Sequence, residues 1–152
     1  MAVEMELSRI LIRELINAQI IELKEVDGER TFPIVVGLPE AFAIERRLKG
    51  DEPPRPQTHD LLASVIMHLG GELKHIVVND LREGTFFARL HIQQGDTIHE
   101  IDSRPSDAIA IGIAERVPIF VEEHVLAEVE ADASWGQIPE DDEDEPEVFD
   151  WD

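Results

Sequence analysis

The first part of the chain contains apolar segments of strand length, and one of them alternates between apolar and polar residues, which is the pattern of a strand that buries one face. Residues 6–16 and 19–26 are rich in Ile and Leu, and each segment is short enough to be a strand. An Asp-Gly pair at 27–28 marks a tight turn, and apolar and polar residues alternate over 30–37 after it. The two segments that flank the turn are therefore predicted to form a β-hairpin.

A first helix is predicted from Pro39 to Gly50, because proline fits the first turn of a helix and glycine fits its end. Apolar residues at helical spacing form one face of this helix. Three basic residues lie in its last turn: Arg46, Arg47 and Lys49. They complement the negative end of the helix dipole, and we interpret them as a solvated helix end.

Three prolines in residues 53–56 predict an extended connector that leads into a second helix. Thr58 is the predicted N-cap of this helix, and Gly70 is its predicted end. Apolar residues at helical spacing predict that one face is buried. This stripe consists of Leu61, Leu62, Val65, Ile66 and Leu69.

A second hairpin is predicted over residues 72–81 and 85–93, and another strand over 97–102. Pro105, with an aspartate in the turn that follows, predicts the start of a helix, and the N-terminus of a helix can attract anions. Residues 108–114 are all Ala, Ile or Gly, so this helix is expected to be buried, with its small residues close to a sheet. The alternation of small and branched residues also fits a strand, but the proline favours a helix.

The C-terminal part changes in composition. A short strand is predicted over 118–121 and a short acidic helix over 122–133, whereas residues 134–152 contain few core formers and many acids. This segment is predicted to be a disordered acidic tail. Phe149 and Trp151 lie among its carboxylates, so the tail could imitate a nucleic-acid strand and compete for the site, or it could recruit a partner protein.

Together these elements predict an α+β fold. We expect one compact domain over residues 1–133, with a mixed, mostly antiparallel sheet and three main helices, followed by the tail at 134–152. A chain of 152 residues fits one domain, and a domain of this size buries roughly 70% of its unfolded surface.

The composition of the chain excludes several kinds of binding site and several classes of protein. The absence of cysteine excludes disulfides and thiolate zinc sites and fits a reducing cytosol. The N-terminal residues lack the pattern of a signal peptide, and no apolar run approaches the roughly 20 residues of a membrane helix, so we expect a soluble, cytoplasmic protein. Of the net charge of −21, residues 128–152 contribute −12, which leaves −9 for residues 1–127. Because residues 1–127 are also acidic, a large binding surface for nucleic acid is disfavoured. Any contact with phosphate groups must therefore involve only a small part of the surface.

Polar residues gather at the predicted strand ends and helix starts. The candidates are Glu40, Arg55, Thr58, His59, Asp60, Asp80, Asp102, Arg104, Ser106 and Asp107. Singly, each has a structural explanation: Thr58 and Ser106 can cap helices, and the arginines can bridge to nearby aspartates. Together, carboxylates can hold Mg²⁺ or Mn²⁺, a histidine can activate water, and arginines can bind phosphate oxygens. The set is therefore compatible with phosphodiester hydrolysis.

Four motifs within residues 6–126 resemble, in order, those of the bifunctional nuclease (BFN) domain family. They are IVVGLPEA at 34–41, PRPQTHDL at 54–61, NDL at 79–81 with GTFFA at 84–88, and DSRPSDAIA at 102–110. The resemblance implies a compact, usually oligomeric α+β domain. It also implies nuclease activity, which is reported on both DNA and RNA for plant members.

On this resemblance, nine of the candidate residues fall on motif positions of the family: Glu40, Arg55, Thr58, His59, Asp60, Asp102, Arg104, Ser106 and Asp107. We expect catalytic roles for His59, Asp60, Asp102, Asp107 and Glu40, and substrate contacts from Arg55, Arg104, Thr58 and Ser106. Asp60, Asp102 and Asp107 are the expected ligands of a divalent metal, Mg²⁺ or Mn²⁺.

The predicted function is that of a nuclease acting on DNA, RNA or both, in a homo-oligomer of two or more subunits. One alternative is a non-enzymatic module that binds a small anion or a protein in the same pocket. Another is a structural oligomer in which the Arg-Pro motifs bridge subunits.

Overall fold

The computed structural model describes residues 1–13, 15, 18–131 and 147–150. The strands within these residues are β1 (Ala2–Ile12), β2 (Gln19–Glu25), β3 (Thr31–Val36), β4 (Gly71–Arg82), β5 (Thr85–Gln94), β6 (Thr97–Ser103), β7 (Ile119–Glu122) and β8 (Glu147–Asp150). The α-helices are α1 (Leu38–Lys49), α2 (Thr58–His68), α3 (Pro105–Gly112) and α4 (Glu123–Ala131), and a 3₁₀ turn (Ile113–Glu115) follows α3.

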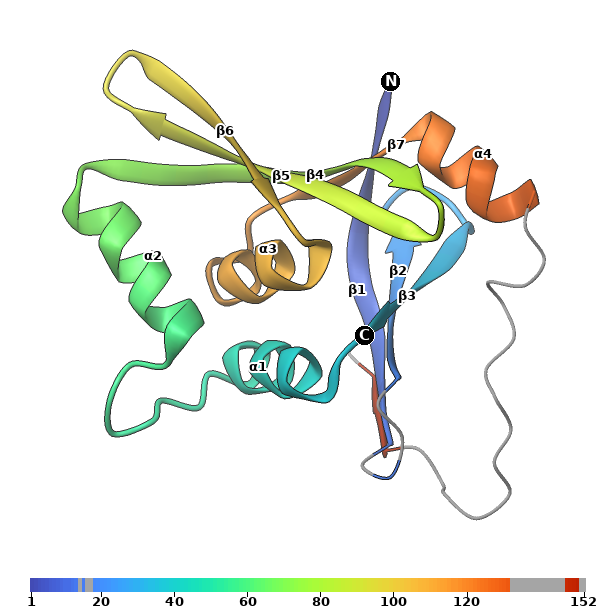
Figure 1. Ribbon diagram of the computed structural model, residues 1–152, viewed down its shortest axis with the longest axis horizontal. Helices are drawn as coiled ribbons and strands as arrows, with labels where there is room; N and C mark the ends of the chain where they lie inside the picture. The colour runs from blue at the N-terminus through green and yellow to red at the C-terminus, as the bar shows by residue number, and fades with distance from the viewer. Residues whose placement is uncertain (14, 16–17, 132–146, 151–152) are drawn as a thin grey trace.

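The strands form one mixed sheet in the order β3-β2-β1-β7-β4-β5-β6, and β8 also pairs with β1 (Figure 1). Only β4 and β7 run parallel among the described pairs. The prediction of a single α+β domain with a mostly antiparallel sheet is therefore confirmed. β1 begins at Ala2, earlier than predicted, because its first residues pair with β7.

The alternation in the sequence places one face of each long strand in the core. In β5, Phe86, Ala88, Leu90 and Ile92 are buried, whereas the residues between them are not. The predicted hairpins β2–β3 and β4–β5 are both present. The helices α1 and α3 cover the buried face, which creates the surface on which polar side chains gather.

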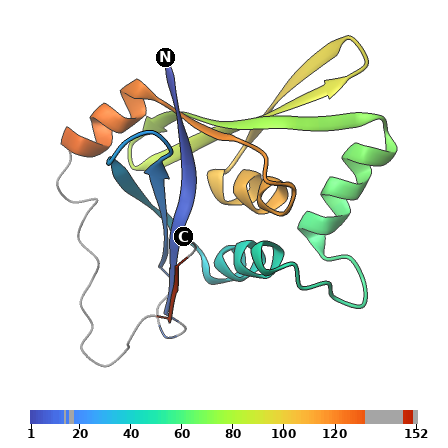
Figure 2. The same ribbon diagram turned by 180° about the vertical axis from the view of Figure 1, so that it is seen from behind.

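Helix α3 lies between α1 and the strands β4 and β5, as both views show (Figures 1 and 2). Every residue of α3 is buried except Asp107, so the prediction of a buried helix is confirmed. The small residues allow this approach: a Cβ on Gly112 would lie 2.6 Å from Cδ1 of Ile76 in β4. The N-cap is Arg104, so the prediction that Ser106 caps the helix is wrong.

Helix α2 differs from its prediction in two respects. Its N-cap is Gln57 rather than Thr58, and the backbone N–H of Gln57 donates to Asp60 Oδ2 over 2.9 Å. The helix has no buried residue, so the predicted buried stripe is wrong. Of that stripe only Ile66 packs against the core, and Leu61, Leu62, Val65 and Leu69 are exposed. The helix stands at the end of β4 far from β1 (Figure 1).

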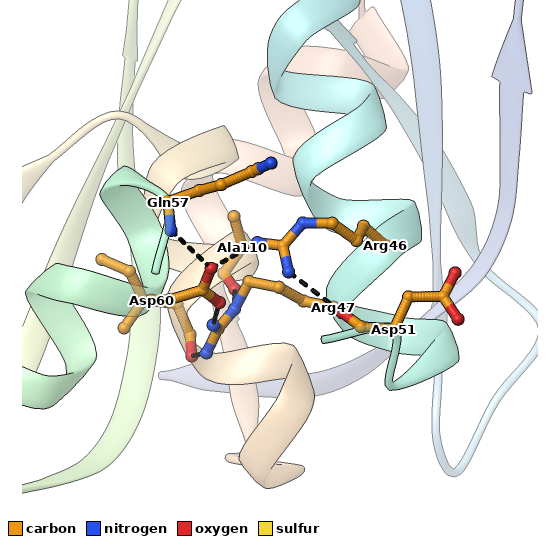
Figure 3. A network of polar contacts seen from close by, with 7 residues as sticks. Arg46, Arg47, Asp51, Gln57, Asp60 and Ala110 are labelled. Atoms are coloured by element: carbon orange, nitrogen blue, oxygen red, sulfur yellow. Dashed lines mark hydrogen bonds and ion pairs between the residues drawn. The ribbon is translucent and has the colours of Figure 1, made fainter. Parts of the chain in front are cut away.

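Arg47 joins the three helices α1, α2 and α3 (Figure 3). Its side chain is 8% exposed, and its guanidinium donates to the backbone carbonyls of Ala110 and Ile111 near the end of α3. It also pairs with Asp60 of α2, which Arg46 contacts at 2.8 Å. The interpretation of this helix end as solvated is therefore wrong for Arg47.

Asp60 has a depressed pKa within this network. Burial by itself raises the pKa of Asp60, but hydrogen bonds from the Gln57 N–H and from both guanidinium groups outweigh burial and hold the pKa below its ordinary value. Asp60 is thus an ionised partner of Arg46 and Arg47 near neutral pH. A buried guanidinium with matched acceptors fixes geometry, because leaving any of them unpaired is costly.

The C-terminal segment also departs from its prediction. Residues 147–150, expected to lie in a disordered tail, form β8, which pairs antiparallel with Arg9–Ile12 of β1. The rest of the predicted tail, 134–146 and 151–152, lies outside the described residues. The predicted acidic helix is present as α4.

Replacing Arg47 with Met should lower the free energy of unfolding by about 3 kcal/mol or more, because Asp60 and two carbonyls lose their buried donor. Lys49→Met is the matched control, because Lys49 lies in the same helical turn but forms a more exposed pair with Glu45. The control should change stability by less than about 1 kcal/mol. Urea unfolding measures both, and equal stability of the two variants would contradict the role of Arg47.

Candidate functional site

A pocket of about 620 Å³ opens between α1, α2, α3 and the strands β5 and β6. Its polar lining includes Gln57, Ser103 and six residues that were predicted as site residues: Glu40, Thr58, His59, Asp102, Arg104 and Asp107. Its apolar lining includes Leu62, Ile66 and Ile101, which the sequence did not indicate as site residues. The pocket therefore gathers six of the nine predicted residues.

A chain of polar contacts connects four of these side chains. His59 Nε2 lies 2.9 Å from Asp107 Oδ1, and Arg104 Nε donates to Asp107 Oδ2 over 2.9 Å. Arg104 Nη1 lies 3.4 Å from Glu40 Oε1. The four residues come from the first turns of α1, α2 and α3, so helix starts that are distant in the sequence meet at one point.

Local sequence explains why these groups can approach. Pro105 sets the start of α3 and leaves Asp107 in its first turn, where the helix dipole favours a carboxylate. Glu40 folds back over Gly37, where any Cβ would collide with the Glu40 carboxylate. His59 is the second residue of α2, next to Asp60, which Arg47 ties to the end of α3.

The carboxylate of Asp107 sets the tautomer of His59. Burial raises the pKa of Asp107, but the hydrogen bonds from Arg104 and His59 outweigh it and hold the pKa below its ordinary value. An ionised carboxylate can only accept, so a neutral His59 donates its Nε2 proton to Asp107. The other ring nitrogen, Nδ1, is then the free proton acceptor, oriented by a carboxylate as in general-base pairs.

Ser106 borders a second, smaller pocket of about 380 Å³, which it shares with Glu40 and Arg104. Its side chain is buried, with 6% exposed. Among the described residues, no group forms a hydrogen bond with its hydroxyl. This pocket lies at the N-terminus of α3, where the N–H groups of Ser106 and Asp107 precede the first intrahelical bond, from Ala108 N–H to the Arg104 carbonyl.

Two of the remaining predicted residues, Asp60 and Arg55, do not join the site. Asp60 is held by Arg46 and Arg47, and Arg55 lies in the connector and lines neither pocket. Asp102 borders the larger pocket from β6, opposite Arg89 in the strand register.

The expected metal ligands Asp60, Asp102 and Asp107 are not brought together. In the part of the chain that the structure describes, no group of three His, Asp or Glu side chains is placed to hold a metal ion. Asp60 and Asp107 each already have arginine partners. The carboxylates of Asp60, Asp102 and Asp107 therefore do not form a binding site for a divalent cation in this arrangement. A requirement for Mg²⁺ or Mn²⁺ stays a prediction.

Sequence reasoning missed Arg47, which holds α2 beside α3. The available signal was its spacing, because Arg47 comes three residues after the buried Ile44 and so borders the buried face of α1. The apolar wall of the pocket gave no comparable signal, since Leu62 and Ile66 look like ordinary core residues in the sequence.

Comparison with known proteins gives a family match and two relatives. The model of the bifunctional nuclease domain matches residues 21–134. Two relatives come from Mycobacterium tuberculosis: the uncharacterized protein MT1877 of strain CDC 1551 and the uncharacterized protein Rv1829 of strain H37Rv. Each is 42% identical over 125 residues, which are 82% of this chain and 74% of the relative. No helix among the described residues is long and apolar enough to cross a membrane.

The contacts of Asp107 predict a pH-dependent loss of stability in Asp107→Asn. Because the pKa of Asp107 is depressed, its contribution is present above the ordinary aspartate pKa of about 4 and is lost as the pH falls through the lower folded value. At pH 7 the variant should be less stable than the wild type by roughly 1–3 kcal/mol, and the gap should shrink below pH 4. Urea unfolding at several pH values measures the gap, and a gap that does not change with pH would contradict this assignment.

Proposed function

Because the chain belongs to the bifunctional nuclease domain family, we propose that it hydrolyses phosphodiester bonds of DNA, RNA or both. The observation that carries this proposal is the contact chain His59–Asp107–Arg104 at the mouth of the larger pocket. It combines a candidate base, a group that orients this base, and a cation for phosphate. All three belong to motifs that resemble those of the family.

His59 acts as the general base. Its Nδ1 takes a proton from the attacking water as the water oxygen bonds to phosphorus, and Asp107 stabilises the imidazolium that forms. The opposite P–O bond breaks, and the leaving oxygen takes a proton from the solvent. Neither role requires a metal ion, so no step is assigned to Mg²⁺ or Mn²⁺. The proposed chemistry places the scissile phosphate within reach of the histidine and the arginine together.

Arg104 binds the phosphate. Its Nε and Nη1 point to Asp107 and Glu40, and its Nη2 has no partner among the described residues. The side chain is 65% exposed, so it can adjust to a phosphate oxygen. Guanidinium groups suit this task because they present several donors in one plane.

The charge of the protein limits the substrate contact. The pocket is lined by three carboxylates, those of Glu40, Asp102 and Asp107, and the whole chain carries −21, so a long duplex would be repelled from most of the surface. We therefore assign contacts with only one or two phosphates, and weak affinity that depends on the presence of Arg104.

A second candidate function is the binding of a small anion without catalysis. The hydroxyl of Ser106, which belongs to a residue that lines the smaller pocket and has no hydrogen-bond partner among the described residues, supports it. Together with the helix N-terminus and Arg104, this hydroxyl would suit a phosphate or carboxylate group. Binding without cleavage that is lost in Ser106→Ala would favour this function.

Purified full-length protein should cleave labelled single-stranded or duplex DNA or RNA, and His59→Gln should reduce the rate by about 100-fold or more. Gel separation of the products in the presence of Mg²⁺, Mn²⁺ or EDTA measures the rate and also tests the predicted metal.

His68→Gln is the matched control, because His68 lies at the other end of α2 and bonds only to Ser64 among the described residues. The control should keep wild-type activity, which also excludes a contaminating nuclease as the source of the difference. Equal rates for wild type and His59→Gln would remove His59 from the mechanism.

A further inference from the structure

The smaller pocket of about 380 Å³ adjoins the larger one, because Glu40 and Arg104 line both. The rest of its lining comes from segments that have no part in the proposed hydrolysis. They are residues 34–37 at the end of β3, residues 84–86 at the start of β5, and residues 105–106 at the start of α3. Three of the four sequence motifs therefore meet here, and a ligand in this pocket would be the neighbour of a ligand in the larger pocket.

The N-terminus of α3 gives this pocket hydrogen-bond donors without acceptors. Its N-cap, Arg104, makes no side-chain cap, and Pro105 has no N–H group. The N–H groups of Ser106 and Asp107 precede the first bond within the helix, and in the described part of the chain neither has an acceptor. Because the helix dipole is also positive at this end, the pocket favours an anion.

The hydroxyl of Ser106 indicates a ligand independently of the helix. Ser106 is 6% exposed and lines the smaller pocket, and its hydroxyl forms no hydrogen bond with any residue that the structure describes. A hydroxyl group that is removed from bulk water without a partner is costly, so a bound acceptor is favoured. Thr85 of β5 adds a second hydroxyl to the lining. A phosphate group has enough oxygen atoms to accept from both hydroxyls and from the helix N–H groups.

The charges at the smaller pocket also suit a phosphate. Among the residues that line it, Glu40 is the only carboxylate and Arg104 the only cation, and the two side chains lie 3.4 Å apart. Their charges offset one another, so the positive end of α3 decides which ligand is attracted. Arg104 also contacts Asp107 at the larger pocket, so it lies between the two cavities. A guanidinium carries five N–H donors, which is enough for a phosphate on each side.

We propose that the smaller pocket binds a second phosphate of the nucleic-acid strand, next to the phosphate that is cleaved in the larger pocket. This second contact rests on the proposed hydrolysis and specifies its substrate further. A phosphodiester bond is bound well only where an adjacent nucleotide carries a phosphate of its own, so bonds inside a strand are preferred to the bond of an unphosphorylated dinucleotide. Ser106 and the N–H groups of α3 contact the second phosphate and take no part in bond cleavage.

NMR titration of full-length His59→Gln, which should not cleave the ligands, tests the subsite. A dinucleotide with an extra terminal phosphate at one of its two ends, 5′ or 3′, should bind at least about 10-fold more tightly than the dinucleotide without it, because charge-assisted hydrogen bonds are added. The amide resonances of Ser106 and Asp107 should shift with the extra phosphate. Equal affinities with and without the phosphate at both ends, or amides that do not respond, would overturn the proposal.

Ser106→Ala in the same background should lose most of the gain from the extra phosphate and bind the plain dinucleotide as before. The free variant should be at least as stable as its parent, since the lost hydroxyl has no partner in the described part of the chain. Ser64→Ala is the matched control, because Ser64 lies in α2 and lines neither pocket. The control should keep the full gain. A gain that survives Ser106→Ala would contradict the proposal.

The subsite and the hydrolysis can fail separately. If the wild type cleaves no nucleic acid but the extra phosphate tightens binding, the hydrolysis is wrong and the subsite stands. If strands are cleaved but the extra phosphate adds nothing, the hydrolysis stands and the subsite is wrong. In cleavage of an oligonucleotide, Ser106→Ala should raise KM at least about 10-fold and leave kcat nearly unchanged, because the lost contact is the same in the bound substrate and the transition state.

Discussion

The buried guanidinium of Arg47 is the interaction on which the candidate site depends. It meets the carbonyls of Ala110 and Ile111, where the α3 dipole is negative, and it holds Asp60 at the start of α2. One turn earlier in α3, Asp107 contacts His59, the neighbour of Asp60. The contacts of Arg47 with Asp60 and of Asp107 with His59 therefore connect α2 and α3 at two places, one helical turn apart. The buried contact of Arg47 fixes the geometry of the contact between Asp107 and His59.

This arrangement explains why α2 can keep its place with so little burial. Helix α2 has no buried residue, so packing alone would hold it weakly. The ion pairs of Asp60 anchor its N-terminal turn, whereas Leu61, Val65 and Leu69 stay exposed along its length.

The fold was largely predictable from the sequence because its elements have local signals. Alternation identified the hairpins, and Pro105 with the Ala, Ile and Gly run identified α3. The exposure of α2 was not predictable, because periodicity gives the apolar face of a helix but not what covers it. The pairing of β8 with β1 was also missed, since composition alone indicated disorder.

The sequence predicted which residues meet in the candidate site, but it did not predict what each of them does there. His59, Asp107, Arg104 and Glu40 do meet, because helix starts converge. Asp60 does not join them, and nothing in its local sequence distinguishes a partner of Arg47 from a metal ligand. Such assignments depend on long-range contacts, which single-sequence reasoning cannot supply.

In the proposed hydrolysis, His59 and Asp107 act as one unit. A double-mutant cycle of His59→Gln and Asp107→Asn, measured as the rate of oligonucleotide cleavage, tests it most directly. If Asp107 works only through His59, the double variant should be no slower than His59→Gln alone. If the two losses instead multiply, the residues act independently and the account is contradicted.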